Sequence, residues 1–111
     1  MISANLDLRK GGGLIPAIIQ DEQTKAILML GYMNEESLGR SVSTGFVCFW
    51  SRSRKKLWMK GEESGNTLRI KRIFVDCDED TLLISVELSG ISACHTGKYS
   101  CFFTELREDS L

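Results

Sequence analysis

Three cysteines, Cys77, Cys94 and Cys101, lie among polar residues, where a thiolate can serve as a metal ligand. Zinc binds thiolates in a tetrahedron, and a catalytic zinc keeps one of its positions for water. Three cysteines without a fourth ligand therefore fit an open zinc site. Sixteen residues separate Cys77 from Cys94 and six separate Cys94 from Cys101, which is not the C-x-x-C spacing of common zinc sites. The spacing alone therefore leaves the metal open.

The fourth cysteine, Cys48, lies inside the apolar run FVCFW at 46–50, which predicts a small buried hydrophobic residue. An even number of cysteines also permits disulfides, so a redox or disulfide protein is an alternative. Disulfides belong to oxidising compartments, and the first residues, MISANLDLRKGGG, lack the apolar centre of a secretory signal. No apolar run approaches the roughly 18 residues of a membrane span. We therefore expect a cytoplasmic protein without a membrane partner.

An acidic segment, DCDED at 76–80, alternates carboxylates with Cys77. If this segment is extended, Asp76, Asp78 and Asp80 share one face and Cys77 points to the other. Carboxylate oxygens suit Mg²⁺ or Ca²⁺, whereas a thiolate suits zinc, so one segment could contact two metals. The alternative is an acidic turn, because aspartate is common in turns. An EF-hand is disfavoured because its flanking helices are absent.

The only histidine, His95, follows Cys94 directly. It could bind a metal or transfer a proton near neutral pH. A nucleophile–base pair of Cys94 and His95 is disfavoured, because adjacent side chains on a strand point apart.

Residues 52–72 form a basic segment with eight basic and two acidic residues. The basic residues are Arg52, Arg54, Lys55, Lys56, Lys60, Arg69, Lys71 and Arg72, and the acids are Glu62 and Glu63. Hydroxyls and guanidinium groups in SRSR at 51–54 suit a phosphate, and Trp50 and Trp58 could stack on a base. The alternatives are a phosphorylated nucleotide, RNA, or a solvated basic face. The net charge of −1 argues against general nucleic-acid binding.

The elements that position these residues are mostly strands. The length of 111 residues favours one domain over 1–111. Apolar and alternating runs predict strands at 14–20, 26–32, 46–50, 68–76 and 81–88, a short final strand at 101–106, and a hairpin around 77–80. A helix is expected over 34–44, capped by Asn34 and ended by Gly45, with Leu38 and Val42 facing the core. We therefore predict a β-rich α+β fold with mainly antiparallel strands and one or two short helices.

Six segments in order resemble the phosphoribosyl-AMP cyclohydrolase family of histidine biosynthesis. They are GLIPA at 13–17, MLGYMN at 29–34, SRSR at 51–54, LWMKGE at 57–62 with SGN at 64–66, DCDED at 76–80, and ACHTG at 93–97 with SCF at 100–102. Each is weak alone, but six in order, covering most of residues 13–103, are specific. Gly31, in place of alanine, and Leu88, in place of glutamine, depart from the family pattern.

The resemblance implies a hydrolase that opens the adenine ring of phosphoribosyl-AMP at the N1–C6 bond. It implies zinc on Cys77, Cys94 and Cys101, and magnesium on the three aspartates Asp76, Asp78 and Asp80. It also implies an obligate-type homodimer whose zinc ligands come from both subunits. Many relatives carry a fused pyrophosphohydrolase domain, and we expect that activity to be absent here.

Roles for the remaining candidates follow from the residue chemistry and the resemblance together. His95 is the candidate for proton transfer. The substrate-binding candidates are Ser51, Arg52, Ser53 and Arg54 for phosphate, and Trp58 and Lys60 for the rest of the nucleotide. The alternative function is a zinc-stabilised RNA-binding module that uses the basic segment, and it predicts affinity that falls steeply with salt.

Overall fold

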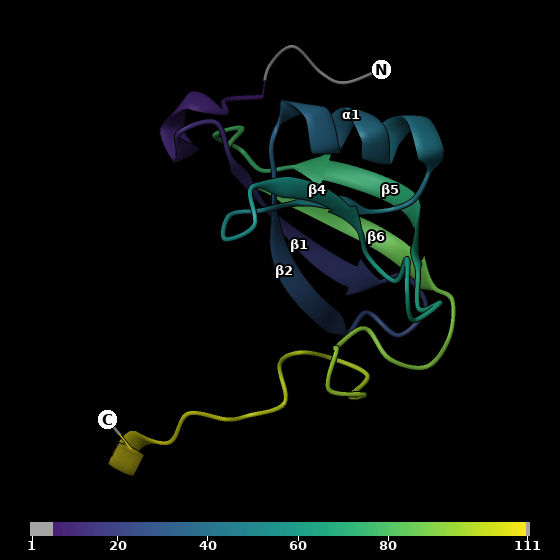
Figure 1. The fold of residues 1–111 in the computed structure, drawn as a ribbon. Coiled ribbons are helices and arrows are strands. Elements are labelled where there is room, and N and C mark those ends of the chain that lie inside the picture. Colours follow the sequence, from purple (N-terminus) through teal and green to yellow (C-terminus); the bar gives the residue numbers. More distant parts are fainter. Residues whose placement is uncertain (1–5, 111) are drawn as a thin grey trace.

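The computed structural model describes residues 6–110 and consists of six strands, one α-helix and two short 3₁₀ turns (Figure 1). The elements are η1 (Arg9–Gly11), β1 (Ile15–Asp21), β2 (Ile27–Met33), α1 (Glu35–Thr44), β3 (Cys48–Ser51), β4 (Lys56–Met59), β5 (Leu68–Val75), β6 (Leu82–Leu88) and η2 (Glu108–Ser110). The predicted α+β class with mostly antiparallel strands and little helix is confirmed.

Four strands form one sheet in the order β2-β1-β6-β5, and β3 pairs with β4 in a second sheet. The pairs β1–β2 and β5–β6 are antiparallel, as expected for strands joined by short turns. The central pair β1–β6 is parallel, and it joins strands far apart in the sequence, from Ala17 opposite Leu82 to Asp21 opposite Val86. This parallel pairing was not predicted, because local patterns carry no information about it.

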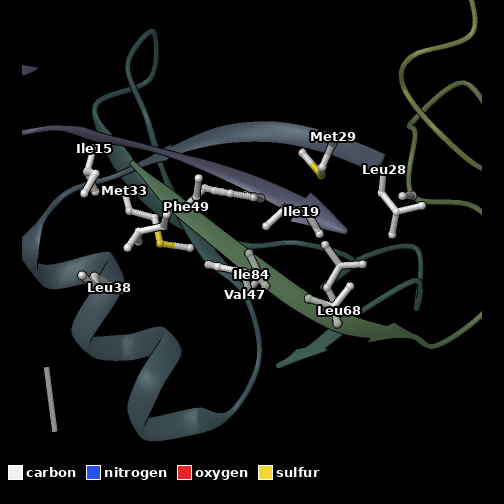
Figure 2. Close-up of a cluster of buried hydrophobic side chains, with 14 residues drawn as sticks. Ile15, Ile19, Leu28, Met29, Met33, Leu38, Val47, Phe49, Leu68 and Ile84 are labelled. Carbon is white, nitrogen blue, oxygen red and sulfur yellow. The ribbon is translucent and has the colours of Figure 1, made fainter. Parts of the chain in front are cut away.

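The core lies between the four-stranded sheet and the β3–β4 hairpin, which packs across it (Figure 1). Residues alternate along β1, so that Ile15, Ala17 and Ile19 are fully buried on one face. Phe49 and Val47 reach this face from the hairpin side, and both are buried (Figure 2). The hairpin is therefore held to the sheet by burial of apolar side chains.

Helix α1 begins and ends at the predicted residues. The Asn34 side chain accepts from the Ser37 N–H, the Ser37 hydroxyl accepts from the Asn34 N–H, and Gly45 ends the helix in the left-handed conformation. Leu38 is buried and lies at the end of the core near Ile15 and Met33 (Figure 2). In the described part of the chain, no helix has the length and apolar character needed to cross a membrane.

The prediction that Val42 faces the core is wrong, because Val42 is 38% exposed. The buried residues of α1 are Ser37, Leu38 and Ser41. At about 100° per residue, Val42 lies about 40° beyond Leu38, on the side away from the two serines. The Ser41 hydroxyl is satisfied, since it accepts from the Cys48 N–H at 2.8 Å and lies 2.8 Å from the Ser37 carbonyl oxygen.

Two expectations about strands are corrected. Residues 101–106 form no strand. After the single backbone hydrogen bond from the Cys101 N–H to the Leu28 carbonyl, the segment leaves the body of the protein, and Phe102 and Leu106 are 62% and 70% exposed (Figure 1). Conversely, β4 was not predicted, because its four residues lie in the polar basic segment. These residues become a strand because they pair with β3, from Cys48 opposite Met59 to Ser51 opposite Lys56. Local composition does not indicate this pairing.

Gly31 is required by the packing of Phe49. A Cβ atom built on Gly31 would lie 2.6 Å from Cδ1 and 2.9 Å from Cζ of Phe49. Real Cβ contacts are not this short, and Phe49 is 1% exposed, so its ring has little room to move. The absence of a side chain at Gly31 therefore allows an aromatic ring to lie directly on the backbone of β2.

Gly31→Ala is expected to destabilise the fold by about 1–3 kcal/mol, because it overpacks a filled site. Urea denaturation measures this cost, and Gly11→Ala, where the new Cβ meets no atom within 4 Å, is the matched control. In a Phe49→Leu background the cost should shrink, since the ring is gone. Equal costs in both backgrounds would contradict the assignment of the clash to Phe49.

Candidate functional site

The loop that follows β6 carries Cys94, His95 and Cys101. It folds back on itself through two backbone hydrogen bonds, from the Ala93 N–H to the Tyr99 carbonyl and from the Cys94 N–H to the Lys98 carbonyl, both 3.1 Å. The Gly97 N–H closes the turn by donating to the Cys94 carbonyl at 3.0 Å. The turn brings the two ends of the loop together. Cys94 and Cys101 therefore become neighbours, although six residues separate them in the sequence.

The two thiols of this loop interact, and their pKa values shift in opposite directions. The hydroxyl of Thr96, 3.0 Å from the Cys94 sulfur, lowers the pKa of Cys94. Partial burial of the sulfur raises the pKa of Cys101, and the hydrogen bond with Cys94 raises it further. The positive charge of Lys60 acts on both thiols and favours their thiolate forms. Cys94 is therefore the member of the pair that ionises first.

Tyr99 ties the cysteine loop to the β1–β2 turn. Its hydroxyl donates to Oδ2 of Asp21 at 2.5 Å and lies 2.6 Å from the Thr24 hydroxyl. The other carboxylate oxygen, Oδ1, accepts from the Gln23 N–H at 2.8 Å, so Asp21 is itself fixed. Burial alone would raise the pKa of Asp21, but these hydrogen bonds outweigh it and the pKa is lowered.

Two further contacts hold the C-terminal end of the loop on β2. The Ser100 hydroxyl donates to the Ile27 carbonyl, and the Cys101 N–H donates to the Leu28 carbonyl, both at 2.7 Å. The two cysteines of the loop are thereby placed at the end of the sheet where β2 begins and β1 ends.

Asp76, Asp78 and Asp80 converge at the opposite end of the sheet, in the β5–β6 turn. Each offers a carboxylate oxygen within 4.8 Å of the others. The predicted hairpin around 77–80 is confirmed, and of the two alternatives for the acidic segment the structure shows the turn, with Glu79 in the left-handed region at φ 63°. The turn curls because Oδ1 of Asp76 accepts from the N–H groups of Asp80 and Thr81, at 3.0 and 3.1 Å. Desolvation would raise the pKa of Asp76, but these hydrogen bonds lower it overall.

Cys77 is exposed in this acidic turn and lies away from the other two cysteines. The acidic turn precedes β6 and the cysteine loop follows it, and β6 has seven residues. At about 3.3 Å per residue, the strand separates the two ends by about 20 Å. Among residues 6–110, only the three aspartates form a cluster of three or more potential metal ligands. One chain therefore does not assemble its three polar cysteines.

A cavity of about 500 Å³, here called the first cavity, brings several predicted residues together. Its lining residues are Ser51, Arg54, Lys56, Trp58, Met59, Gly61, Glu62, Glu63, Ser64 and His95. His95, next to the buried Cys94, thus faces the same space as one end of the basic segment. Of the other predicted substrate-binding residues, Arg52 and Ser53 lie outside the first cavity, and Lys60 is buried near the thiols.

Several residues of the site carried no signal in the sequence. Tyr99 and Asp21 are 78 positions apart, and only the fold brings them together. In the sequence, Glu62 and Glu63 were considered only as the two acids of the basic segment, whereas in the structure they line the first cavity. The prediction for Cys48 is confirmed, since it is buried, and burial raises the pKa of its thiol. All four cysteines are free thiols.

Comparison with known proteins shows the family to which the chain is related. The family model described as phosphoribosyl-AMP cyclohydrolase matches residues 29–103. A protein of that name from Solibacter usitatus is 54% identical over 102 residues, covering 92% of this chain and 81% of the relative. Another, from Nitrosomonas europaea, is 60% identical over 95 residues, covering 86% of this chain and 74% of the relative.

A longer relative is named histidine biosynthesis bifunctional protein HisIE, from Staphylococcus aureus. It is 55% identical over 106 residues, which make up 96% of this chain and 49% of that relative, so this chain spans about half its length. The family model and the names of these relatives identify the chain as an enzyme of histidine biosynthesis. The chain belongs to the phosphoribosyl-AMP cyclohydrolase family.

Tyr99→Phe is expected to destabilise the protein by about 1 kcal/mol at pH 7, because it removes a hydrogen bond to a carboxylate that is held in place. A carboxyl with a lowered pKa contributes stability above its unfolded pKa and loses it as the pH falls through its folded pKa. The difference between the urea midpoints of wild type and variant should therefore shrink as the pH falls below the usual pKa range of an aspartate.

The control is Tyr32→Phe, because residues 6–110 make no hydrogen bond to the Tyr32 hydroxyl. It should show no such pH dependence. A Tyr99→Phe deficit that stays constant from pH 7 to pH 2.5 would contradict the coupling to Asp21.

Proposed function

We propose that this protein opens the adenine ring of phosphoribosyl-AMP by hydrolysis of the N1–C6 bond, with zinc held by Cys77, Cys94 and Cys101 of a homodimer. The observation that carries the proposal is the separation of the cysteines. Cys94 and Cys101 are neighbours at one end of β6, and Cys77 is exposed at the other end. A second copy that offers its Cys77 to the Cys94–Cys101 pair completes a three-thiolate set.

The residues fit zinc in type and in ionisation. Thiolates are soft ligands that zinc prefers, and the Thr96 hydroxyl lowers the pKa of Cys94 towards the required charge state. Tyr99 and Ser100 fix the loop that carries the pair, in the manner of outer contacts that orient metal ligands. When bound, zinc would supply a Lewis acid that makes water nucleophilic at neutral pH.

The three aspartates fit a hard cation, and we assign magnesium to Asp76, Asp78 and Asp80. Their oxygens lie close enough together to share one ion. They sit beside Cys77, so a partner that supplies Cys77 would bring the magnesium site to the zinc site. Magnesium there could bind a substrate phosphate or order the turn.

His95 is the proposed proton-transfer residue. In the overall reaction of the neutral substrate one water molecule is consumed. Its oxygen becomes the new carbonyl oxygen on C6, one of its protons goes to N1 as the N1–C6 bond breaks, and the other goes to the exocyclic nitrogen on C6, which becomes the amide. An imidazole in the first cavity can accept the proton from water and deliver it to N1. His95 follows Cys94 directly, so the cysteine loop that positions the thiols also positions the imidazole.

We assign phosphate binding to Ser51, Arg52, Ser53 and Arg54, and contact with the base to Trp58. Lys60 is buried beside the thiols, where its positive charge favours their thiolate forms. A reducing, cytoplasmic location belongs to the same proposal, because the ligands must remain thiols. The alternative of an RNA-binding module gains no support, since the relatives bear enzyme names.

Mixing two inactive variants tests the shared zinc site. Cys77→Ser and Cys94→Ser are each expected to lose zinc and activity. In a mixed dimer, one of the two sites receives an intact Cys77 from one chain and intact Cys94 and Cys101 from the other. With random exchange, half of the dimers are mixed, so about a quarter of wild-type turnover should return.

Mixing Cys94→Ser with Cys101→Ser is the matched control, because neither chain then supplies an intact pair and no site is restored. Zinc content should follow turnover, at about one ion per wild-type chain. Recovery in the control mixture, or full activity of Cys94→Ser alone, would contradict the proposal.

His95→Ala is expected to lower kcat by about a hundredfold or more, because a positioned acid–base group contributes on that scale. Zinc content should stay at the wild-type level, which separates proton transfer from metal binding. Steady-state turnover and metal analysis of the same preparation measure both. A kcat near that of wild type would remove the proton-transfer role from His95.

A further inference from the structure

A second cavity of about 560 Å³ lies beside the first, along β2 and β3. Ser51 and Trp58 line both cavities, so they form a shared wall between them. Trp58 is packed against Phe49, with ring centroids 5.3 Å apart, and this contact fixes the indole at the wall. The molecule therefore offers two adjoining spaces with an aromatic ring at their junction.

The second cavity has one charged group among its described lining residues, the guanidinium of Arg52. It lies 4.0 Å from the centre of the Tyr32 ring. Stacking on the ring face positions the guanidinium and leaves its in-plane N–H groups free to donate. No residue within 6–110 forms a salt bridge to Arg52. Arg52 is thus a prepared donor for an anion that enters the second cavity.

The rest of the second cavity is apolar or neutral and suits a sugar and the edge of a base. Phe49 forms part of the lining, and it lies as deep as it does because Gly31 has no side chain. Ser53, whose hydroxyl lies 3.4 Å from that of Ser51, adds a donor next to Arg52. In the first cavity, by contrast, Arg54 and Lys56 stand with His95.

The β3–β4 turn divides its cations between the two cavities. The Arg54 N–H donates to the Ser51 hydroxyl at 3.1 Å, and this tight turn separates Arg52 from Arg54. Arg52 lines only the second cavity and Arg54 only the first. Two phosphate-binding groups two residues apart thus serve different spaces.

We propose that the second cavity binds the AMP arm of the substrate, with its 5′-phosphate on Arg52, while the arm on N1 lies in the first cavity with its phosphate on Arg54. This inference rests on the proposed function. Phosphoribosyl-AMP carries two phosphorylated riboses, on N9 and N1, which leave the purine from opposite ends. His95 lines the first cavity, so the reacting N1–C6 end belongs there and the N9 end extends past Trp58 into the second.

The proposed division of the substrate between the two cavities is tested with two ligands that each resemble one arm of it. AMP and ribose 5-phosphate are titrated calorimetrically into wild type, Arg52→Gln and Arg54→Gln, and AMP is also tested as a competitive inhibitor of turnover. Arg52→Gln should weaken AMP binding about tenfold or more, the cost of a lost charged hydrogen-bond partner, and leave ribose 5-phosphate within about twofold. Arg54→Gln should have the converse effect.

Lys55→Asn is the matched control. It removes one charge from the same turn, Lys55 lines neither cavity, and asparagine tolerates its left-handed φ of 53°. AMP affinity should stay within about twofold of wild type. Tyr32→Leu, which removes the ring under the guanidinium, should weaken AMP binding but not ribose 5-phosphate binding.

Equal weakening of AMP by Arg52→Gln and Arg54→Gln would overturn the division, as would wild-type turnover that AMP does not inhibit. These outcomes differ from failure of the proposed function. In that case phosphoribosyl-AMP is not turned over at all, although AMP binding can still depend on Arg52.

Discussion

The parallel pairing of β1 with β6 determines where the candidate functional residues lie. Its register runs from Ala17 opposite Leu82 to Asp21 opposite Val86. The two strands therefore lie side by side, with their starts at one end of the sheet and their ends at the other. The acidic turn before β6 therefore lies at the start of β1, and the cysteine loop after β6 lies at its end, within reach of Asp21. Because the strand is rigid and about 20 Å long, the thiols of one chain stay divided into a single and a pair.

The second constraint is the contact of Phe49 with the backbone of Gly31. It holds the β3–β4 hairpin against β2 and thereby places Trp58 and the cationic turn over the edge of the sheet. Both cavities depend on this placement, since the hairpin supplies a wall to each. Stability and recognition are thus linked through one buried ring.

Local patterns predicted the elements well where the signal is local. Asn34 and Gly45 bound the helix, because capping depends on residues within one turn. Alternation predicted β5 and β6 and the turn between them. The same reasoning failed for Val42, whose burial depends on which arc of the helix meets the sheet, and for β4, whose order comes from its partner strand.

The sequence by itself determined the chemistry: three thiols in polar surroundings, three aspartates, one histidine and a basic segment, in the order of the family. Only the tertiary structure decided their grouping. It curled the aspartates into a cluster through backbone hydrogen bonds, joined Cys94 to Cys101, and kept Cys77 apart. The physical reason is that residue type is a local property, whereas strand order and register arise from long-range pairing and burial.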